Sequence, residues 1–94
     1  MVRVLIDRKV LEDRISDYQL AVRGVRIRAM DYPGYVSGET LCDADDPRRY
    51  VTISTWSNRA AWLAWAASDT RRELMEKLAP LLMQTERVTV LEPS

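Results

Sequence analysis

The chain has 94 residues, and 14 basic residues balance 14 acidic ones, so its formal net charge is zero. A zero net charge removes the general electrostatic argument for binding nucleic acid or an anionic membrane surface. The chain contains no histidine and a single cysteine, Cys42. These counts exclude an imidazole base, a histidine ligand for zinc or haem iron, an intrachain disulfide and a cysteine zinc cluster within this chain.

The hydrophobic fraction of 47% and the charged fraction of 30% are ordinary for a folded protein, and they predict a single domain over residues 1–94. The longest apolar run, residues 60–67, is far shorter than the ~20 residues of a membrane-spanning helix. The first ten residues contain no apolar stretch of signal-peptide length. With one cysteine, which fits a reducing compartment, we expect a soluble, cytoplasmic protein.

The first half of the chain predicts a strand followed by a helix. Residues 2–7 alternate, with three aliphatic side chains on one face, as in a strand. Over residues 11–29 the apolar residues form the stripe of an amphipathic helix. Acidic residues in its first half and arginines in its second half suit the helix dipole. Pro33 and Gly34 should end this helix.

Two further strands are predicted after that helix. Residues 35–42 form a strand with weaker alternation, in which Gly38 marks a bulge or a close backbone approach. The acidic stretch 43–47 predicts a hairpin turn. Residues 50–56 are the clearest strand in the sequence, because they alternate throughout.

The remainder of the chain predicts two helices and a last strand. Residues 57–58 offer a cap for a short helix. Thr70 and Glu73 have the spacing of a capping box for another helix, which Pro80 should bend or shorten. Residues 86–91 predict the last strand.

The element order β-α-β-β-α-β in a chain of this length predicts an α+β protein with the ferredoxin-like arrangement, a four-stranded antiparallel sheet with helices on one face. Several large apolar residues should lie on sheet faces that two helices cannot both cover. A surface of that kind seldom stays exposed to water, so we expect a homodimer in which a second copy packs sheet to sheet. These residues are Leu5, Tyr35, Leu41, Tyr50, Trp56 and Leu91.

All three tryptophans, Trp56, Trp62 and Trp65, fall within ten residues and are surrounded by alanines. Trp62 and Trp65 are three residues apart, so they are neighbours on one face of a helix. Two interpretations are open. The tryptophans fill a thin core beside the small alanines, or they wall a pocket for a flat aromatic ligand.

The segments GYVSGETL at residues 34–41 and YVTISTWSNRAAWLAWAASD at residues 50–69 resemble the antibiotic biosynthesis monooxygenase family, and the element order and length agree. The resemblance implies a dimeric α/β barrel. It also implies that some members oxygenate aromatic polyketides, such as anthrones or quinols, with molecular oxygen and no cofactor. Close relatives bind and degrade haem, and other members have no established activity.

The resemblance also implies roles for individual residues. Trp56 and Trp62 match aromatic pocket positions of the cofactor-free members, and Thr52 lies where those enzymes place an asparagine. Trp65 matches the tryptophan that crowds the haem in the degrading relatives, and Met75 lies where their proximal histidine would be. Because this chain has no histidine, the resemblance does not favour haem degradation.

Cofactor-free oxygenation needs an apolar cavity, a proton acceptor and hydrogen bonds to a developing oxyanion. We expect Trp56, Thr52 and Asp7 to be catalytic, with Asp7 or, alternatively, Glu39 as the proton acceptor. The residues expected to bind the substrate are Tyr35, Trp62, Trp65 and Met75.

Two functions therefore remain open. The first is a cofactor-independent monooxygenase acting on an aromatic polyketide- or quinol-like molecule. The second is a non-catalytic, dimeric small-molecule-binding or accessory module of the same fold, which the missing asparagine and histidine favour. For both we expect no cofactor, no metal, a small aromatic ligand, a homodimer, and neither nucleic acid nor membrane as a partner.

Overall fold

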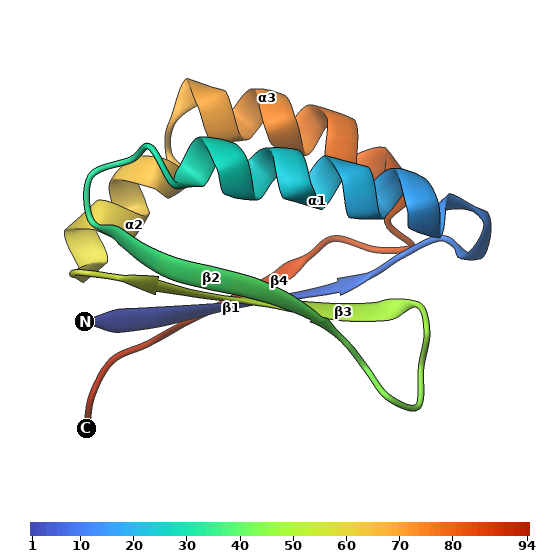
Figure 1. The fold of residues 1–94 in the computed structure, drawn as a ribbon, viewed down its shortest axis with the longest axis horizontal. Helices are drawn as coiled ribbons and strands as arrows, with labels where there is room; N and C mark the ends of the chain where they lie inside the picture. The colour runs from blue at the N-terminus through green and yellow to red at the C-terminus, as the bar shows by residue number, and fades with distance from the viewer.

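The computed structural model describes residues 1–94 as one four-stranded antiparallel sheet with the helices on a single side (Figure 1). The strands are β1 (Val2–Lys9), β2 (Tyr35–Cys42), β3 (Arg49–Trp56) and β4 (Arg87–Leu91), in the spatial order β2-β3-β1-β4. The helices are α1 (Ile15–Ala29), α2 (Arg59–Ala66) and α3 (Asp69–Leu78), with 3-10 turns at η1 (Glu12–Arg14) and η2 (Ala79–Leu81). This arrangement confirms the predicted ferredoxin-like α+β fold.

The two faces of the sheet differ because side chains alternate along each strand. Val4 of β1 pairs with Ser54 of β3, and both are buried beneath the helices. The next pair, Leu5 and Ile53, is only half-buried and lies on the opposite side, which we call the open face. Helices α1 and α3 lie side by side over the covered face (Figure 1).

The apolar stripe predicted over residues 11–29 faces the sheet as expected. Tyr18 and Ala29 are buried, and Ile15, Val22 and Val25 pack against the buried clusters. The α-helix itself begins later than predicted, because a 3-10 turn at residues 12–14 precedes it.

The expectation for the uncovered sheet surface is wrong for its three aromatic residues. Trp56 and Tyr50 are buried beneath the helices, and the Tyr35 ring packs edge-on against Trp56 at 5.3 Å. Alternation tells which residues share a face, but it does not tell which of the two faces the helices cover. Three leucines remain on the open face, Leu5, Leu41 and Leu91.

Strand β2 contains the predicted close approach at Gly38, but its bulge lies elsewhere. The register shifts between Tyr35 and Ser37. A Cβ atom at Gly38 would lie 2.6 Å from the Tyr35 hydroxyl, so only glycine lets that hydroxyl lie against the strand. The bulge and the glycine together turn the Tyr35 side chain along its own strand toward the space beneath the helices.

The helix caps are confirmed in one case and displaced in the other. Asn58 caps α2, since its side chain accepts a hydrogen bond from the Ala61 backbone N–H at 2.8 Å. Helix α3 is capped by Ser68, which accepts from the Arg71 backbone N–H, and not by Thr70 as predicted. The α-helix ends at Leu78, two residues before proline, as expected.

Candidate functional site

A cavity of about 50 Å³ lies between the covered face of the sheet and the three helices. Its apolar lining combines Trp56, Trp62 and Trp65 with Val25 and Ala29 of α1. Small-molecule pockets usually measure ~300–1,000 Å³. A ligand of several fused rings therefore enters only if side chains at the rim of this cavity move apart.

The three tryptophans form one packed cluster. Trp56 stacks on Trp65 with ring centroids 6.4 Å apart and planes at 22°, and Trp62 meets Trp56 edge-on at 5.9 Å. These are spacings of rings in direct contact, so no ligand ring fits between Trp56 and Trp65. The indole N–H of Trp56 donates to Ser54 Oγ at 3.1 Å. The tryptophans are thus core residues that also line the cavity.

The structure brings five of the seven predicted site residues to this cavity. The hydroxyl of Thr52, on β3, lies 2.8 Å from the hydroxyl of Thr40 on β2. The five residues are Tyr35, Thr52, Trp56, Trp62 and Trp65.

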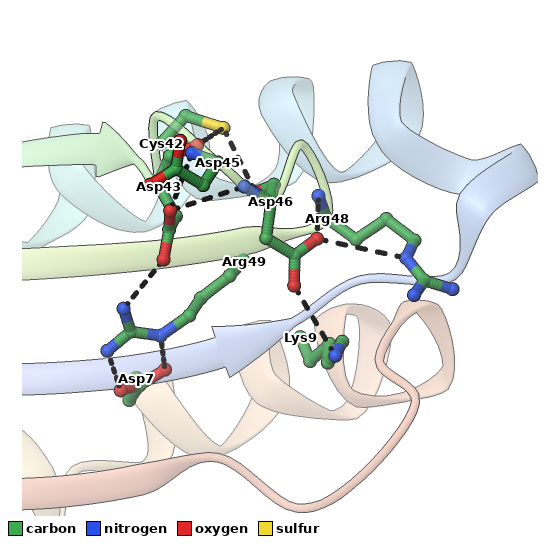
Figure 2. Close-up of polar contacts among 8 residues, drawn as sticks. All are labelled: Asp7, Lys9, Cys42, Asp43, Asp45, Asp46, Arg48 and Arg49. Carbon is green, nitrogen blue, oxygen red and sulfur yellow. Dashed lines mark hydrogen bonds and ion pairs between the residues drawn. The ribbon is translucent and has the colours of Figure 1, made fainter.

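Asp7 is not brought to the cavity. Its position on β1, paired with Val51, places it on the open face. There its carboxylate accepts hydrogen bonds from Arg49 Nε at 3.2 Å and Nη2 at 2.7 Å (Figure 2). Arg49 also donates to Asp43 at 2.9 Å, and the pKa of Asp43 is lowered, first by the Asp45 backbone N–H and then by Arg49. Asp7 therefore belongs to the ion network of the β2–β3 hairpin.

Glu39 and Met75 take different places from one another. Glu39, the alternative proton acceptor, is exposed and pairs with Ile53, so it lies on the open face, where it lines a surface groove with Arg3 and Thr55. Met75 packs against Leu78 and lines surface grooves on α3, together with Ala79. It does not share the cavity with the tryptophans.

Sequence reasoning missed a buried ionic group beside the cavity, formed by Arg8, Glu86 and Arg71. Arg8 Nε donates to Glu86 Oε1 at 2.9 Å, and Arg71 Nη2 donates to Glu86 Oε2 at 2.9 Å. The exposed fractions of these side chains are 1% for Arg8, 12% for Arg71 and 16% for Glu86. Burial raises the pKa of Glu86, but the two guanidinium groups outweigh it and hold that pKa below its usual value. The carboxylate is therefore ionised at neutral pH.

A signal for the two arginines is present in the sequence. Arg8 continues the inward-facing series of alternate residues in the first strand, where an apolar side chain is expected. Arg71 lies three residues before Leu74 and seven before Leu78, on the buried side of α3. A charged residue at an inward position is rarely buried without a partner, so each arginine indicated a buried ion pair.

No group of three or more His, Cys, Asp and Glu side chains is placed to hold a metal ion. None of the helices combines the length and the apolar character needed to cross a membrane.

Comparison with known proteins gives matches over most of the chain. The family model described as antibiotic biosynthesis monooxygenase matches residues 1–77. The "42.8 kDa protein in whiE locus" of Streptomyces coelicolor is 29% identical over 84 residues, which cover 89% of this chain. They cover 21% of that protein, so the chain spans about a fifth of the length of this curated relative.

Two solved structures superpose closely. A conserved protein from Methanosarcina mazei Go1 matches with a TM-score of 0.93 at 12% identity, over 99% of this chain and 92% of that one. SnoaB, a cofactor-independent oxygenase from Streptomyces nogalater, matches in a mutant form with a TM-score of 0.88 at 17% identity, over 98% of this chain and 91% of that one. At these identities the two structures establish the fold.

Proposed function

The chain belongs to the antibiotic biosynthesis monooxygenase family, and from this premise we propose that it is a cofactor-independent monooxygenase. Its substrate is an aromatic polyketide- or quinol-like small molecule, which it oxygenates with molecular oxygen. The observation that carries this proposal is the cavity beneath the helices, where Tyr35 and Thr52 join the tryptophan cluster. The shared fold with SnoaB, a cofactor-independent oxygenase, supports it.

The proposed reaction balances without an external reductant. A carbon activated by a neighbouring phenolic oxygen loses a proton, and the resulting anion passes one electron to oxygen. The two radicals combine into a peroxide, which loses water. For a ring methylene, two C–H bonds break, one oxygen atom becomes the carbonyl oxygen and the other leaves in water. The substrate supplies all four electrons.

The cavity residues fit the requirements of this chemistry. The tryptophan cluster excludes water and contacts the aromatic ring of the substrate. The hydroxyls of Tyr35 and Thr52 are the hydrogen-bonding groups that orient a substrate oxygen. Neither candidate proton acceptor lies inside the cavity, because Asp7 pairs with Val51 and Glu39 pairs with Ile53, which places both on the open face. We therefore assign the acceptor role to neither residue, and the substrate proton passes to solvent.

A non-catalytic binding or accessory module is the second candidate. The small volume of the cavity and the closed packing of Trp56 against Trp65 favour it. Turnover separates the two functions, because a binding module consumes no oxygen.

The decisive measurement is oxygen uptake with an anthrone or a dihydroquinone, corrected for autoxidation. We expect one oxygen molecule consumed per substrate molecule, with no accumulation of hydrogen peroxide. Trp56→Phe and Thr52→Val should each lower the rate about tenfold, which corresponds to ~1.4 kcal/mol on the barrier. Phenylalanine is chosen because truncating a buried tryptophan to alanine costs ~3–5 kcal/mol of stability.

Two further variants control this experiment. Thr55→Val removes a hydroxyl from the open face of the same strand and should leave the rate unchanged. Asp7→Asn tests the acceptor on the open face, and a rate equal to that of the unaltered protein removes Asp7 from the mechanism. Ligand binding without oxygen uptake across a panel of such substrates would favour the binding module.

A further inference from the structure

Two buried side-chain polar atoms in this structure have no hydrogen-bond partner, the Tyr35 hydroxyl and Arg71 Nε. Both residues line the cavity described above. Buried donors are almost always paired in native proteins, and an unpaired one needs an explanation. Two unpaired donors at the same cavity indicate that the cavity receives a hydrogen-bond acceptor.

The charge around the cavity indicates what kind of acceptor this is. Arg8 and Arg71 share one carboxylate, Glu86, so this buried group keeps one positive charge. The Arg71 guanidinium also lies 5.6 Å from the centre of the Trp62 ring. At the rim, the exposed Arg26 adds a further positive charge, whereas Glu39 lies on the open face of the sheet. The cavity therefore has a net positive charge inside apolar walls, where charge interactions are stronger than in water.

We propose that the cavity binds the phenolic oxygen of its ligand in the ionised form, between the Nε–H of Arg71 and the hydroxyl of Tyr35. A phenolate oxygen accepts both hydrogen bonds and compensates the unpaired positive charge. A methyl ether of the same shape cannot compensate the charge and is a poor acceptor, so it leaves the buried donors unsatisfied. Gly38 makes this site possible, because any side chain there would displace the Tyr35 hydroxyl.

This inference rests on the aromatic ligand of the proposed function, and it adds how the protein prepares that ligand for oxygen. A nearby positive charge favours the anionic form of an acid and so lowers its pKa. The bound phenol then releases its proton to solvent, and no buried base is needed. This explains how the site can work with Asp7 on the other face of the sheet.

The test uses 4-nitrophenol, whose ionised form is distinguished from the neutral form by its absorption spectrum, and 4-nitroanisole as the matched methyl ether. Both are titrated into the whole protein at several pH values, with binding followed by tryptophan emission. We expect the phenolate to bind about tenfold more tightly than the phenol, so that the pKa of the bound probe falls by ~1 unit. The methyl ether should bind no better than the neutral phenol.

Three variants locate the effect. Arg71→Met removes the excess positive charge while leaving the Arg8–Glu86 pair, and it should abolish the pKa shift of the probe. Tyr35→Phe keeps the ring and should reduce the shift. Arg72→Met removes an exposed arginine of the same helix and should leave the shift unchanged. Circular dichroism verifies that each variant is folded.

Equal binding of phenol and phenolate, equal binding of the methyl ether and the phenolate, or no binding of either probe to the folded protein would each overturn the inference. Its failure is distinguishable from failure of the oxygenase proposal. A preference for phenolate without oxygen uptake leaves the inference standing and removes the activity. Oxygen uptake without a preference for phenolate overturns the inference and leaves the oxygenase proposal standing.

Discussion

At the scale of single residues, Glu86 connects parts of the chain that are distant in sequence. It lies just before β4 and holds Arg8 of β1 and Arg71 of α3 through one carboxylate. Arg8 also donates to the Tyr18 hydroxyl of α1 at 3.3 Å. A buried ion pair contributes little net stability, but removing one partner leaves the other charge uncompensated. Glu86 is therefore the residue of this group whose loss costs most, since it leaves two buried guanidinium groups without a counter-charge.

We predict that Glu86→Gln lowers the free energy of unfolding by ~3 kcal/mol, measured by urea denaturation at neutral pH. The variant should also lose part of the acid dependence of stability. The pKa of Glu86 is lower in the folded chain than in the unfolded one. The ionised carboxylate therefore contributes its full stabilisation of the fold above the usual glutamate pKa of ~4.3, and this contribution decreases as the pH falls below that value.

Glu73→Gln is the matched control for this prediction, because Glu73 is an exposed glutamate of α3. It should change stability by less than ~0.5 kcal/mol. An unfolding free energy for Glu86→Gln equal to that of the control would show that the buried group contributes nothing.

The candidate site could be predicted from sequence in its apolar part but not in its ionic part. The spacing of the tryptophans and the alternation of β3 bring Thr52, Trp56 and Trp62 to one cavity. The same alternation on β1 places Asp7 on the opposite face of the sheet from Ile6, so the sequence could already have predicted that Asp7 lies away from the cavity. The ion pairs of Glu86 could not be predicted from the sequence, because its partners lie 78 and 15 residues away and only the folded chain brings them together.

At the scale of elements, the segment between α1 and β2 passes over the start of α2 at Gly34. This glycine has a φ of 89°, and its carbonyl accepts a hydrogen bond from the Ser57 backbone N–H at 2.7 Å. A Cβ atom at Gly34 would collide with the Cβ atom of Ala61 and lie 2.8 Å from Ser57 Oγ. Glycine is thus required both by the backbone conformation and by the space available.

Two glycine-to-alanine changes should have opposite effects on stability. Gly34→Ala places a side chain in a left-handed conformation against α2 and should destabilise the protein by ~2 kcal/mol. Gly24→Ala lies within α1, where a Cβ atom would meet nothing within 4 Å, and should stabilise the protein by ~0.5–1 kcal/mol. Thermal unfolding of both variants measures the two effects. Shifts of the melting temperature in the same direction would contradict this account.

Element order and type followed from the sequence because the periodicity changes clearly between strands and helices. What could not be predicted at this scale depends on contacts between elements. Thr70 and Ser68 are both adequate caps in isolation, but α3 begins at Asp69 and the Ser68 side chain accepts the hydrogen bond from the Arg71 backbone N–H. The bulge lies at residues 35–37 and not at Gly38, which instead makes room for the Tyr35 hydroxyl.

At the scale of the whole molecule, the helices leave one face of the sheet without cover (Figure 1). On the two central strands of this open face, Leu5 and Ile53 form an apolar pair, and the charged Glu39 lies beside Ile53 on the edge strand β2. Toward one end it becomes charged, where Asp7 and Arg49 form their ion pair (Figure 2). An apolar centre with a polar margin is the usual composition of a protein–protein interface. The occupant we propose is a second copy, packed sheet to sheet.

This proposal predicts a mass of about 22 kDa in light scattering, twice the 10.9 kDa of the chain. Ile53→Lys places a charge at the apolar centre of the open face and should give a folded monomer, since an unpaired charge in a desolvated interface is strongly unfavourable. Leu20→Lys is the control, because Leu20 is 66% exposed on α1, an element on the other side of the sheet. That variant should remain a dimer. A monomer of the unaltered chain at micromolar concentration would contradict the proposed packing, because the open face would then be stable in water. A dimer that Leu20→Lys dissociates and Ile53→Lys does not would also contradict it, because the interface would then lie on the helical side of the sheet.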